Sequence, residues 1–281
     1  MTGIRPTDLV RRYETGTKKR FGQHFLVDSR ALERIVSLMD GVDFDRVLEV
    51  GPGCGTLTAV MLEAGYGVEA VEIDRDAVGF LEESFSEESN FDVTLADFLD
   101  LDLESLLGTT RWCCVANLPY NVATTILFRL FEHLGQFSRL VLMFQKEVAD
   151  RICATPGHPA FGQLSVVCRV FGDVRRAFVV PPGAFLPPPK VQSAVIVFDP
   201  IAGTRVRDRA DRDHLIHVVK SAFANRRKTL VNSLAGAGYD KSSSREALVK
   251  LGWKADVRGE TLGLEQFMLL APELPKLVAV R

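Results

Sequence analysis

The sequence predicts an α/β fold with a Rossmann-like sheet, followed by a small domain made only of helices. Three observations support this prediction. Short apolar strands alternate with helical patterns from about residue 47 to residue 198. A glycine-rich loop at residues 51–55 joins the first of these strands to a helix, which is the opening unit of a nucleotide-binding α/β domain. Beyond residue 213 the chain shows helical patterns and no strand pattern.

The composition is that of a globular protein. The chain has 281 residues, of which 47% are apolar and 25% charged, enough for one large domain and one small one. No run of about 18 apolar residues is present, and the N-terminus has no apolar stretch, so we expect a cytoplasmic protein without a membrane partner. The five cysteines are odd in number and lack metal-ligand spacing, which predicts reduced thiols and no metal site.

The net charge of −2 is unevenly distributed along the chain. Residues 1–198 carry 19 basic and 26 acidic side chains, whereas residues 199–281 carry 15 basic and 10 acidic ones. The first 34 residues carry 8 basic and 4 acidic side chains. An acidic body with two basic ends is compatible with a polyanionic partner, although charge runs are also common on solvated faces.

The glycine-rich loop has the spacing G-x-G-x-G, formed by Gly51, Gly53 and Gly55. Glycine allows positive φ and a close approach of the backbone to a ligand. The dinucleotide fingerprint G-x-G-x-x-G would need glycine at position 56, where Thr56 stands. With Glu49 just before the first glycine, the pattern is typical of S-adenosylmethionine-dependent methyltransferases, and an ordinary glycine turn is the alternative.

Carboxylates follow the next two predicted strands. Glu72 lies 21 residues after Gly51, where it could accept two hydrogen bonds from ribose hydroxyls; an unpaired surface glutamate is the alternative. Asp97 follows a strand at residues 93–95 and could bind an adenine amino group, or else cap a helix. Both would face the crevice at the carboxyl ends of the strands.

The most chemically specific stretch is Asn117-Leu118-Pro119-Tyr120, directly after a strand at residues 112–116. The lone pair of adenine's exocyclic nitrogen is delocalised into the ring, so this nitrogen is a poor nucleophile. The Asn117 side-chain oxygen and the following backbone carbonyl could both accept hydrogen bonds from the amine and orient its lone pair. Tyr120 could stack on the base. A plain turn with a buried tyrosine is the alternative.

The rest of the chain supplies the remaining elements. Further strands are predicted at residues 68–74, 140–144, 177–180 and 193–198, and helices at 75–85, 123–134, 146–153 and 163–171, with Ser29 capping another helix that covers residues 32–39. A proline-rich loop at residues 181–191 would hold Phe185 rigidly as the second wall of a base pocket, unless it is only a linker. Residues 1–17 are polar and are expected to lack regular structure, and residues 201–213 read as a linker.

Two basic clusters are candidate RNA contacts. Lys18, Lys19 and Arg20 precede Phe21 and Phe25, a combination that suits phosphates and stacked bases or, alternatively, an arm whose phenylalanines pack on the core.

Arg226, Arg227 and Lys228 form the second cluster. They would end a helix running from Leu215 through Leu230, placing Lys220 and Arg227 on one face. A solvated helix end is the alternative.

From about residue 18 to residue 270, the chain resembles the ribosomal RNA adenine dimethyltransferases of the small-subunit, KsgA type. The matching pieces are Phe21–Leu26, Glu49–Gly53, Glu72–Asp74, Ala96–Asp97, Asn117–Tyr120, Val180–Ala194 and Asn225–Lys228. The resemblance implies S-adenosylmethionine as cofactor and a seven-stranded class I methyltransferase sheet. It also implies dimethylation of the N6 amines of two adjacent adenosines in a hairpin loop near the 3′ end of 16S rRNA, within a precursor 30S particle. A role in small-subunit biogenesis and a monomeric state are expected.

The resemblance also assigns domains and residues. Residues 1–28 would form a basic arm, 29–200 the methyltransferase domain and 201–281 a helical RNA-binding domain. Cofactor contacts are expected from His24, Leu26, Gly51, Gly53, Glu72, Ile73, Asp97, Phe98 and Asn117. Catalytic positions are Asn117, Leu118, Pro119, Tyr120 and Phe185, and RNA contacts are Lys18, Lys19, Arg20, Lys190, Arg226, Arg227 and Lys228. His24 departs from the asparagine of many members, which weakens its assignment.

Three other functions fit parts of the pattern. One is a large-subunit rRNA adenine N6-methyltransferase of the antibiotic-resistance type, but the proline-rich loop and residues 225–228 favour the small-subunit type. Another is N6-adenine methylation of DNA. The third is a ribosome-assembly factor that binds RNA without catalysis, which the intact residues 117–120 disfavour. Thr56 disfavours a dehydrogenase.

Overall fold

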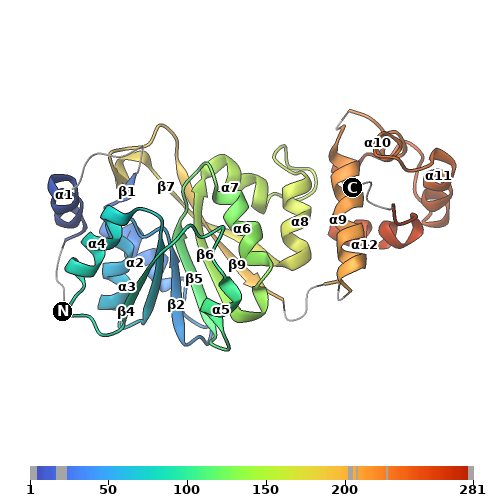
Figure 1. Cartoon of the computed structure of the whole chain (residues 1–281). Helices are drawn as coiled ribbons and strands as arrows, with labels where there is room; N and C mark the ends of the chain where they lie inside the picture. The colour runs from blue at the N-terminus through green and yellow to red at the C-terminus, as the bar shows by residue number, and fades with distance from the viewer. Residues whose placement is uncertain (1–4, 17–23, 202–204, 207, 226, 278–281) are drawn as a thin grey trace. The chain divides into compact units, whose positions relative to one another are not determined.

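The computed structural model describes residues 5–16, 24–201, 205–206, 208–225 and 227–277 (Figure 1). The chain forms two compact units. The first contains residues 1–149 and 175–200 and holds the sheet, and the second contains residues 150–174 and 201–281 and is mainly helical.

A seven-stranded sheet is the centre of the first unit, as expected for the fold class. Its strands, in spatial order, are β4 (Phe91–Leu95), β3 (Val68–Glu72), β2 (Arg46–Val50), β5 (Trp112–Asn117), β6 (Phe137–Gln145), β9 (Ser193–Pro200) and β7 (Gly172–Val180). The strands from β4 to β6 pair in parallel, and β6 pairs with β9 antiparallel. The strand order reverses between β2 and β5, which opens a crevice at their carboxyl ends, the place where such sheets bind ligands.

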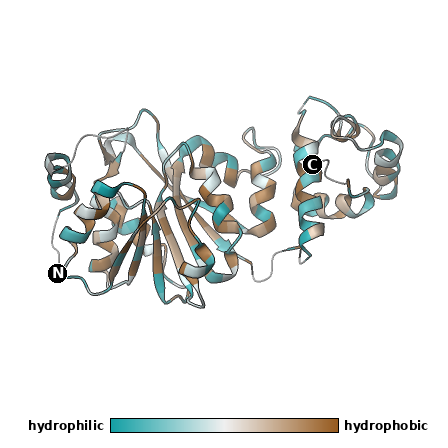
Figure 2. Cartoon of the chain, viewed as in Figure 1, coloured by the Kyte–Doolittle hydropathy of each residue, from teal (hydrophilic) through white to brown (hydrophobic). Residues whose placement is uncertain are grey.

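Helices cover the sheet, so its central strands are buried and strongly apolar (Figures 1 and 2). These helices are α2 (Ser29–Ser37), α3 (Thr56–Glu63), α4 (Arg75–Ser84), α5 (Leu103–Leu107), α6 (Ala123–Phe131) and α7 (Lys146–Cys153). The residue that caps α2 is Asp28, which accepts the Ala31 N–H at 2.8 Å. The expected cap at Ser29 is therefore off by one residue. Asp74 caps α4 in the same way, since its Oδ1 accepts the Asp76 N–H at 2.9 Å.

The N-terminal segment contains a helix, α1 (Pro6–Gly16), so the expectation of no regular structure at residues 1–17 is wrong for this part. Leu9, Val10 and Tyr13 recur at helical spacing and are buried. The Tyr13 ring packs edge-on against Phe25 and Phe80, with centroids 5.6 Å and 5.3 Å away. These tertiary contacts stabilise a helix that its polar composition alone would leave marginal.

A small two-stranded sheet joins two distant segments of the first unit. It pairs β1 (Phe25–Leu26) with β8 (Phe185–Leu186), and a short 3₁₀ helix at Pro182–Ala184 precedes β8. The pairing is antiparallel, with Leu26 opposite Phe185. Phe25 and Leu26 are thus fixed against the proline-rich loop.

The second unit contains α8 (Gln163–Phe171), α9 (Arg209–Phe223), α10 (Leu230–Gly236), α11 (Lys241–Lys250) and α12 (Leu264–Leu270), with short 3₁₀ turns at Gly259–Thr261 and Ala271–Glu273. The sequence places the domain boundary at residue 200. The second unit also contains α8, which precedes that boundary. Val166 and Val170 of α8 are buried in one core with Val218 and Phe267.

The prediction of a single helix from Leu215 through Leu230 is wrong. Helix α9 ends at Phe223 and α10 begins at Leu230, so Arg227 lies in the connection and shares no helix with Lys220. None of the described helices has the length and apolarity that a membrane span requires.

Candidate active site

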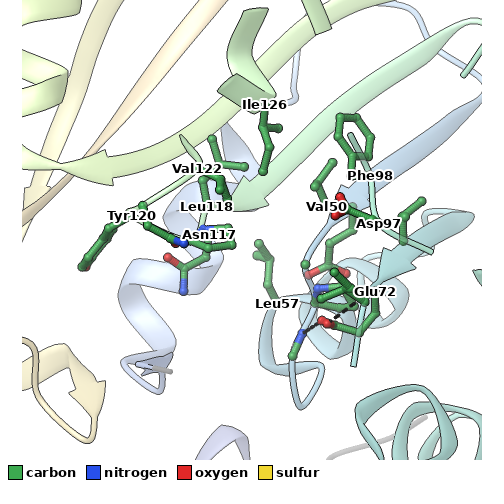
Figure 3. Close-up of a pocket in the computed structure, with 18 of the residues that line it drawn as sticks. Val50, Leu57, Glu72, Asp97, Phe98, Asn117, Leu118, Tyr120, Val122 and Ile126 are labelled. Carbon is green, nitrogen blue, oxygen red and sulfur yellow. Dashed lines mark hydrogen bonds between the residues drawn. The ribbon is translucent and has the colours of Figure 1, made fainter. Parts of the chain in front are cut away.

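A cavity of about 580 Å³ opens at the carboxyl ends of β2, β3 and β5 (Figure 3). Its size falls within the range of small-molecule and cofactor sites. The glycine loop, the ends of β3, β4 and β5, and the segment entering β1 all contribute to its wall. All cofactor positions expected from the sequence lie there: His24, Leu26, Gly51, Gly53, Glu72, Ile73, Asp97, Phe98 and Asn117.

The glycine loop needs glycine for steric reasons at two positions. Gly53 and Gly55 have φ values of 58° and 78°, in the left-handed region. A Cβ at Gly53 would lie 2.9 Å from Phe25 Cε1, and a Cβ at Gly55 would lie 2.7 Å from side-chain carbons of Leu81 and Phe85. The loop therefore passes closely over the core and delivers the N-terminus of α3 to the cavity.

Glu72 ties the glycine loop to the end of β3. One carboxylate oxygen accepts the Gly53 N–H at 3.0 Å, and the other accepts the N–H groups of Ile73 and Asp74 at 2.9 Å and 3.0 Å. Burial raises the pKa of Glu72, and these three backbone donors partly offset that rise. The carboxylate is thus held rigidly in the cavity wall, with one lone pair of Oε2 left for a ligand hydroxyl (Figure 3).

Replacing Glu72 by alanine should weaken S-adenosylmethionine binding by about 1.5–3 kcal/mol, because hydrogen bonds to a charged group are removed. Isothermal titration calorimetry measures this change. Glu69→Ala is the matched control: Glu69 is also a buried acid on β3, but it bonds Thr94 at 3.0 Å and does not line the cavity. Equal affinities in Glu72→Ala and the unaltered protein would remove Glu72 from the site.

Glu49 is a second buried acid of the cavity wall, with only 2% of its surface exposed. Its carboxyl accepts a hydrogen bond from the Thr58 hydroxyl at 2.6 Å. Desolvation raises the pKa of Glu49 to about 8; the Thr58 hydrogen bond lowers it, and the charge of Glu72 raises it further. In the sequence, Glu49 stands out only as a residue that precedes the glycine loop. Its burial could not be predicted, because β2 is flanked by β3 and β5 and the burial depends on the whole sheet.

Asp97 and Ile73 shape the outer part of the cavity. One Asp97 oxygen accepts the Leu99 N–H at 2.9 Å, so this residue caps a turn and still leaves its other oxygen for a ligand. The Ile73 side chain is 65% exposed, which is unusual for a large apolar residue and suits a flat ligand surface against it.

Asn117 ends β5, and its side-chain orientation is set by the backbone of His24. The Asn117 Nδ2 donates to the His24 carbonyl at 3.3 Å, which leaves Oδ1 as an acceptor for a ligand. The Pro119 carbonyl accepts the Val122 N–H at 3.1 Å. Among the described residues, no backbone N–H of this turn bonds the Leu118 carbonyl, so it can serve a ligand amine as a second acceptor beside Asn117 Oδ1.

Tyr120 is held by a residue that the sequence does not single out. Its hydroxyl forms a 2.7 Å hydrogen bond with Ser193 Oγ, and Ser193 is fully buried at the start of β9. The two residues are 73 positions apart, so no local pattern could indicate the pair. This bond fixes the tyrosine ring at the cavity, near-parallel to the His24 ring.

The structure does not make Phe185 a wall of this cavity, contrary to the sequence prediction. Its side chain is 3% exposed and packs in the main core with Val180 and Ala184. The alternation of β8 points Phe185 inward and Leu186, which is 36% exposed, outward.

None of the predicted RNA contacts that the structure describes lines the cavity, and the others lie outside the described residues. Lys190 is exposed in the loop before β9, and Arg227 and Lys228 are exposed in the connection between α9 and α10. Lys18, Lys19, Arg20 and Arg226 lie outside the described residues. Within the described ranges, no group of three His, Cys, Asp or Glu side chains is placed to hold a metal ion.

Comparison with known proteins identifies the family of this chain. The model of the family "Ribosomal RNA adenine dimethylase" matches residues 15–264. "Ribosomal RNA small subunit methyltransferase A" of Syntrophotalea carbinolica is 47% identical over 254 residues, covering 90% of this chain and 95% of that protein. The protein of the same name from Geobacter sulfurreducens is 44% identical over 262 residues, covering 92% and 95%.

Two solved structures share the fold. A dimethyladenosine transferase from Plasmodium falciparum has a TM-score of 0.72 at 24% identity, covering 86% of this chain and 94% of that chain. The 23S rRNA methyltransferase ErmE has a TM-score of 0.70 at 24% identity, covering 89% and 98%. These likenesses establish a class I methyltransferase fold, and the family match with its close relatives goes further: this chain belongs to the ribosomal RNA adenine dimethylase family.

Proposed function

We propose that this protein transfers methyl groups from S-adenosylmethionine to the N6 amines of two adjacent adenosines in a hairpin loop near the 3′ end of 16S rRNA. The observation that carries this proposal is the juxtaposition, in one cavity, of the Glu72 carboxylate with the two acceptors of the turn after β5. One half of the cavity suits a nucleoside, and the other suits an amine.

The cofactor half fits the chemistry of S-adenosylmethionine. Glu72 presents a fixed carboxylate to ribose hydroxyls, and Asp97 has an oxygen left for an adenine amine. Ile73 provides an exposed apolar surface at the cavity for the adenine face. When bound, the cofactor supplies a sulfonium-linked methyl group: the new N–C bond forms as the C–S bond breaks, and the bonding pair stays on sulfur.

The target half orients the adenine amine. Asn117 Oδ1 and the Leu118 carbonyl accept its two hydrogens, which turns the nitrogen lone pair toward the methyl group. The Tyr120 ring, anchored by Ser193, stacks on the base. The amine gains a positive charge as it is methylated and then loses a proton to water. Positioning rather than acid–base chemistry therefore supplies most of the catalysis.

The same geometry favours an adenosine that is already unstacked. A base must leave its helix to reach these acceptors, and this costs less in a hairpin loop than in a duplex. Two of the close relatives are named as small-subunit methyltransferases, which favours 16S over 23S rRNA as the substrate. The proposal also includes a precursor 30S particle as partner and a monomeric state. It further includes a place in small-subunit biogenesis and a cytoplasmic location.

Mass spectrometry of rRNA from cells with and without the gene tests this function. We expect N6,N6-dimethyladenosine to disappear from the 3′ end of 16S rRNA when the protein is absent. Loss of methylated adenosine from 23S rRNA instead would identify the large-subunit, antibiotic-resistance type of enzyme. Unchanged rRNA with an accumulation of immature small subunits would identify an assembly factor without catalysis.

We propose that Arg227 and Lys228 bind RNA phosphates, together with Arg226. Both described residues are exposed in a connection between helices of the second unit. Replacing the pair by alanine should flatten the plot of log affinity against log salt by about 0.7–0.9 for each phosphate that the variant no longer neutralises. Filter binding at several salt concentrations measures this slope.

The matched control for this pair is Lys241→Ala with Lys254→Ala, two exposed lysines of the same unit. It should keep the slope of the unaltered protein. If the Arg227 and Lys228 variant keeps that slope as well, the basic cluster is a solvated turn and binds no phosphate.

A further inference from the structure

Helix α1 packs against the glycine loop, next to α4 (Figure 1). Val10 and Tyr13 of α1 form one buried cluster with Cys54 of the loop and Ala77 of α4. Cys54 is fully buried and does not line the cavity, unlike Gly53 beside it. The glycine loop therefore has the cavity on one side and α1 on the other.

A second contact links α1 to the cavity wall through Phe25. The Tyr13 ring lies edge-on to the Phe25 ring, with centroids 5.6 Å apart. Phe25 lines the cavity, and its ring lies so close to Gly53 that a Cβ there would be 2.9 Å from Phe25 Cε1. The Gly53 N–H donates in turn to the Glu72 carboxylate at 3.0 Å. A continuous set of contacts thus runs from Tyr13 to the carboxylate of the cofactor half.

Helix α1 depends on these contacts for its own stability. It has 11 residues, and an isolated helix shorter than about 12–15 residues is marginal in water. A helix held mainly by tertiary contacts can open at a smaller cost in free energy than the unfolding of the whole domain. Nearly all of α1 precedes residue 15, where the match to the family begins, so its role is inferred from its own contacts.

We propose that Tyr13 is a positioning residue for cofactor binding, and that docking of α1 on the glycine loop and binding of S-adenosylmethionine stabilise each other. Tyr13 does not line the cavity and acts through Phe25 and the glycine loop. The inference rests on the proposed function, because it takes S-adenosylmethionine as the ligand of the cavity. The coupling is reciprocal: docking raises cofactor affinity by the same factor by which the cofactor favours docking.

The Cys54 thiol can report the opening of α1, because it is buried against Val10 and Tyr13. Burial raises the pKa of this thiol to about 12, so the thiolate that reacts with alkylating agents forms mainly in the opened state. Alkylation by iodoacetamide, followed by mass spectrometry of the Cys54 peptide, measures the opening. Cys113 is the internal reference, because it is fully buried in the central strand β5. We expect Cys54 to react faster than Cys113, and saturating S-adenosylmethionine to slow its reaction by about 5-fold or more.

The double variant Val10→Ser with Tyr13→Ala removes the contacts that hold α1 on the loop. Its affinity for S-adenosylmethionine, measured by calorimetry, should fall by about the factor by which the cofactor slows Cys54 alkylation in the unaltered protein. The KM for the cofactor should rise accordingly, whereas kcat at saturating cofactor should change little. Tyr13→Phe keeps the ring contacts and should bind the cofactor like the unaltered protein.

Tyr239→Ala is the matched control, because it removes a buried tyrosine of the second unit. It should change neither the cofactor affinity nor the alkylation of Cys54. In the double variant, slow alkylation of Cys113 verifies that the sheet remains folded.

Three outcomes would overturn the proposal. Equal alkylation rates of Cys54 and Cys113 in the unaltered protein would show that α1 opens only when the domain unfolds. An unchanged cofactor affinity in the double variant would show that α1 does not position the loop. Equally strong protection of Cys54 in both proteins would mean that the cofactor shields the thiol without α1. Failure of the unaltered protein to bind S-adenosylmethionine contradicts the proposed function itself, so the two failures are distinguishable.

Discussion

Asn117→Ala should lower the rate of methyl transfer by about 10²-fold or more, with little change in RNA affinity. The substitution removes one of the two acceptors that orient the adenine amine and leaves Tyr120 and Glu72 in place. This acceptor matters most while the nitrogen attacks the methyl group, so its removal acts on the chemical step more than on binding. Single-turnover methylation of small-subunit particles measures the rate directly.

Asn90→Ala provides the matched control for this change. The Asn90 amide also donates to a backbone carbonyl, that of Tyr66 at 2.8 Å, but it does not line the cavity. It should keep the transfer rate of the unaltered protein. Full activity in Asn117→Ala would reject the assignment of the turn after β5 as the site of catalysis.

Asn117→Asp separates the two methylation steps. Aspartate keeps an acceptor oxygen but replaces the donor that bonds the His24 carbonyl. A neutral amide suits a pocket that must release an amine already carrying one methyl group and bind it again. We expect the variant to retain part of the first methylation and to lose more of the second. Mass spectrometry resolves the mono- and dimethylated products, and equal loss of both steps would show that the amide is not required for dimethylation.

Glu49→Gln should remove a large part of the pH dependence of stability. The Glu49 carboxyl has a pKa of about 8 in the folded protein, against an ordinary value of 4.5. Between these pH values the folded state binds more protons than the unfolded state, so the contribution to the free energy of unfolding is full below about pH 4.5. It falls as the pH rises and is lost above about pH 8, a change on the order of 5 kcal/mol.

Urea denaturation from pH 5 to pH 8.5, without cofactor, measures this difference. The unaltered protein should lose stability across the range more steeply than Glu49→Gln. The pKa of Glu72 is also raised, but Glu72 is present in both proteins, so the comparison isolates Glu49. Parallel stability curves would show that Glu49 is already ionised at neutral pH.

Local patterns predict the parts of the fold and site that depend on spacing along the chain. The glycine loop and the residues following β3 and β5 are identified in this way, because strand ends of a parallel sheet meet at one edge. Helix α1 is missed because its buried positions, such as Tyr13, are stabilised by the distant ring of Phe80. The break between α9 and α10 is missed because the basic run reads equally well as a helix end.

The sequence does not predict the direction in which side chains point in short irregular segments. Phe185 stands in a two-residue strand, where either face could be the buried one, and only the pairing with β1 decides that Leu186 points outward. The anchoring of Tyr120 by Ser193 and of Asn117 by His24 joins residues 73 and 93 positions apart. Such contacts follow from tertiary structure and have no local signal.

Dimethylation of small-subunit rRNA by this cavity is tested most directly with the purified protein, trideuteromethyl-labelled S-adenosylmethionine and small-subunit particles that lack the modification. Nuclease fragments of the 16S rRNA are then analysed by mass spectrometry. Two labelled methyl groups on each of two adjacent adenosines near the 3′ end are the predicted result. An unlabelled 16S rRNA, or label found only when large-subunit particles are supplied, would show that the protein does not dimethylate small-subunit rRNA.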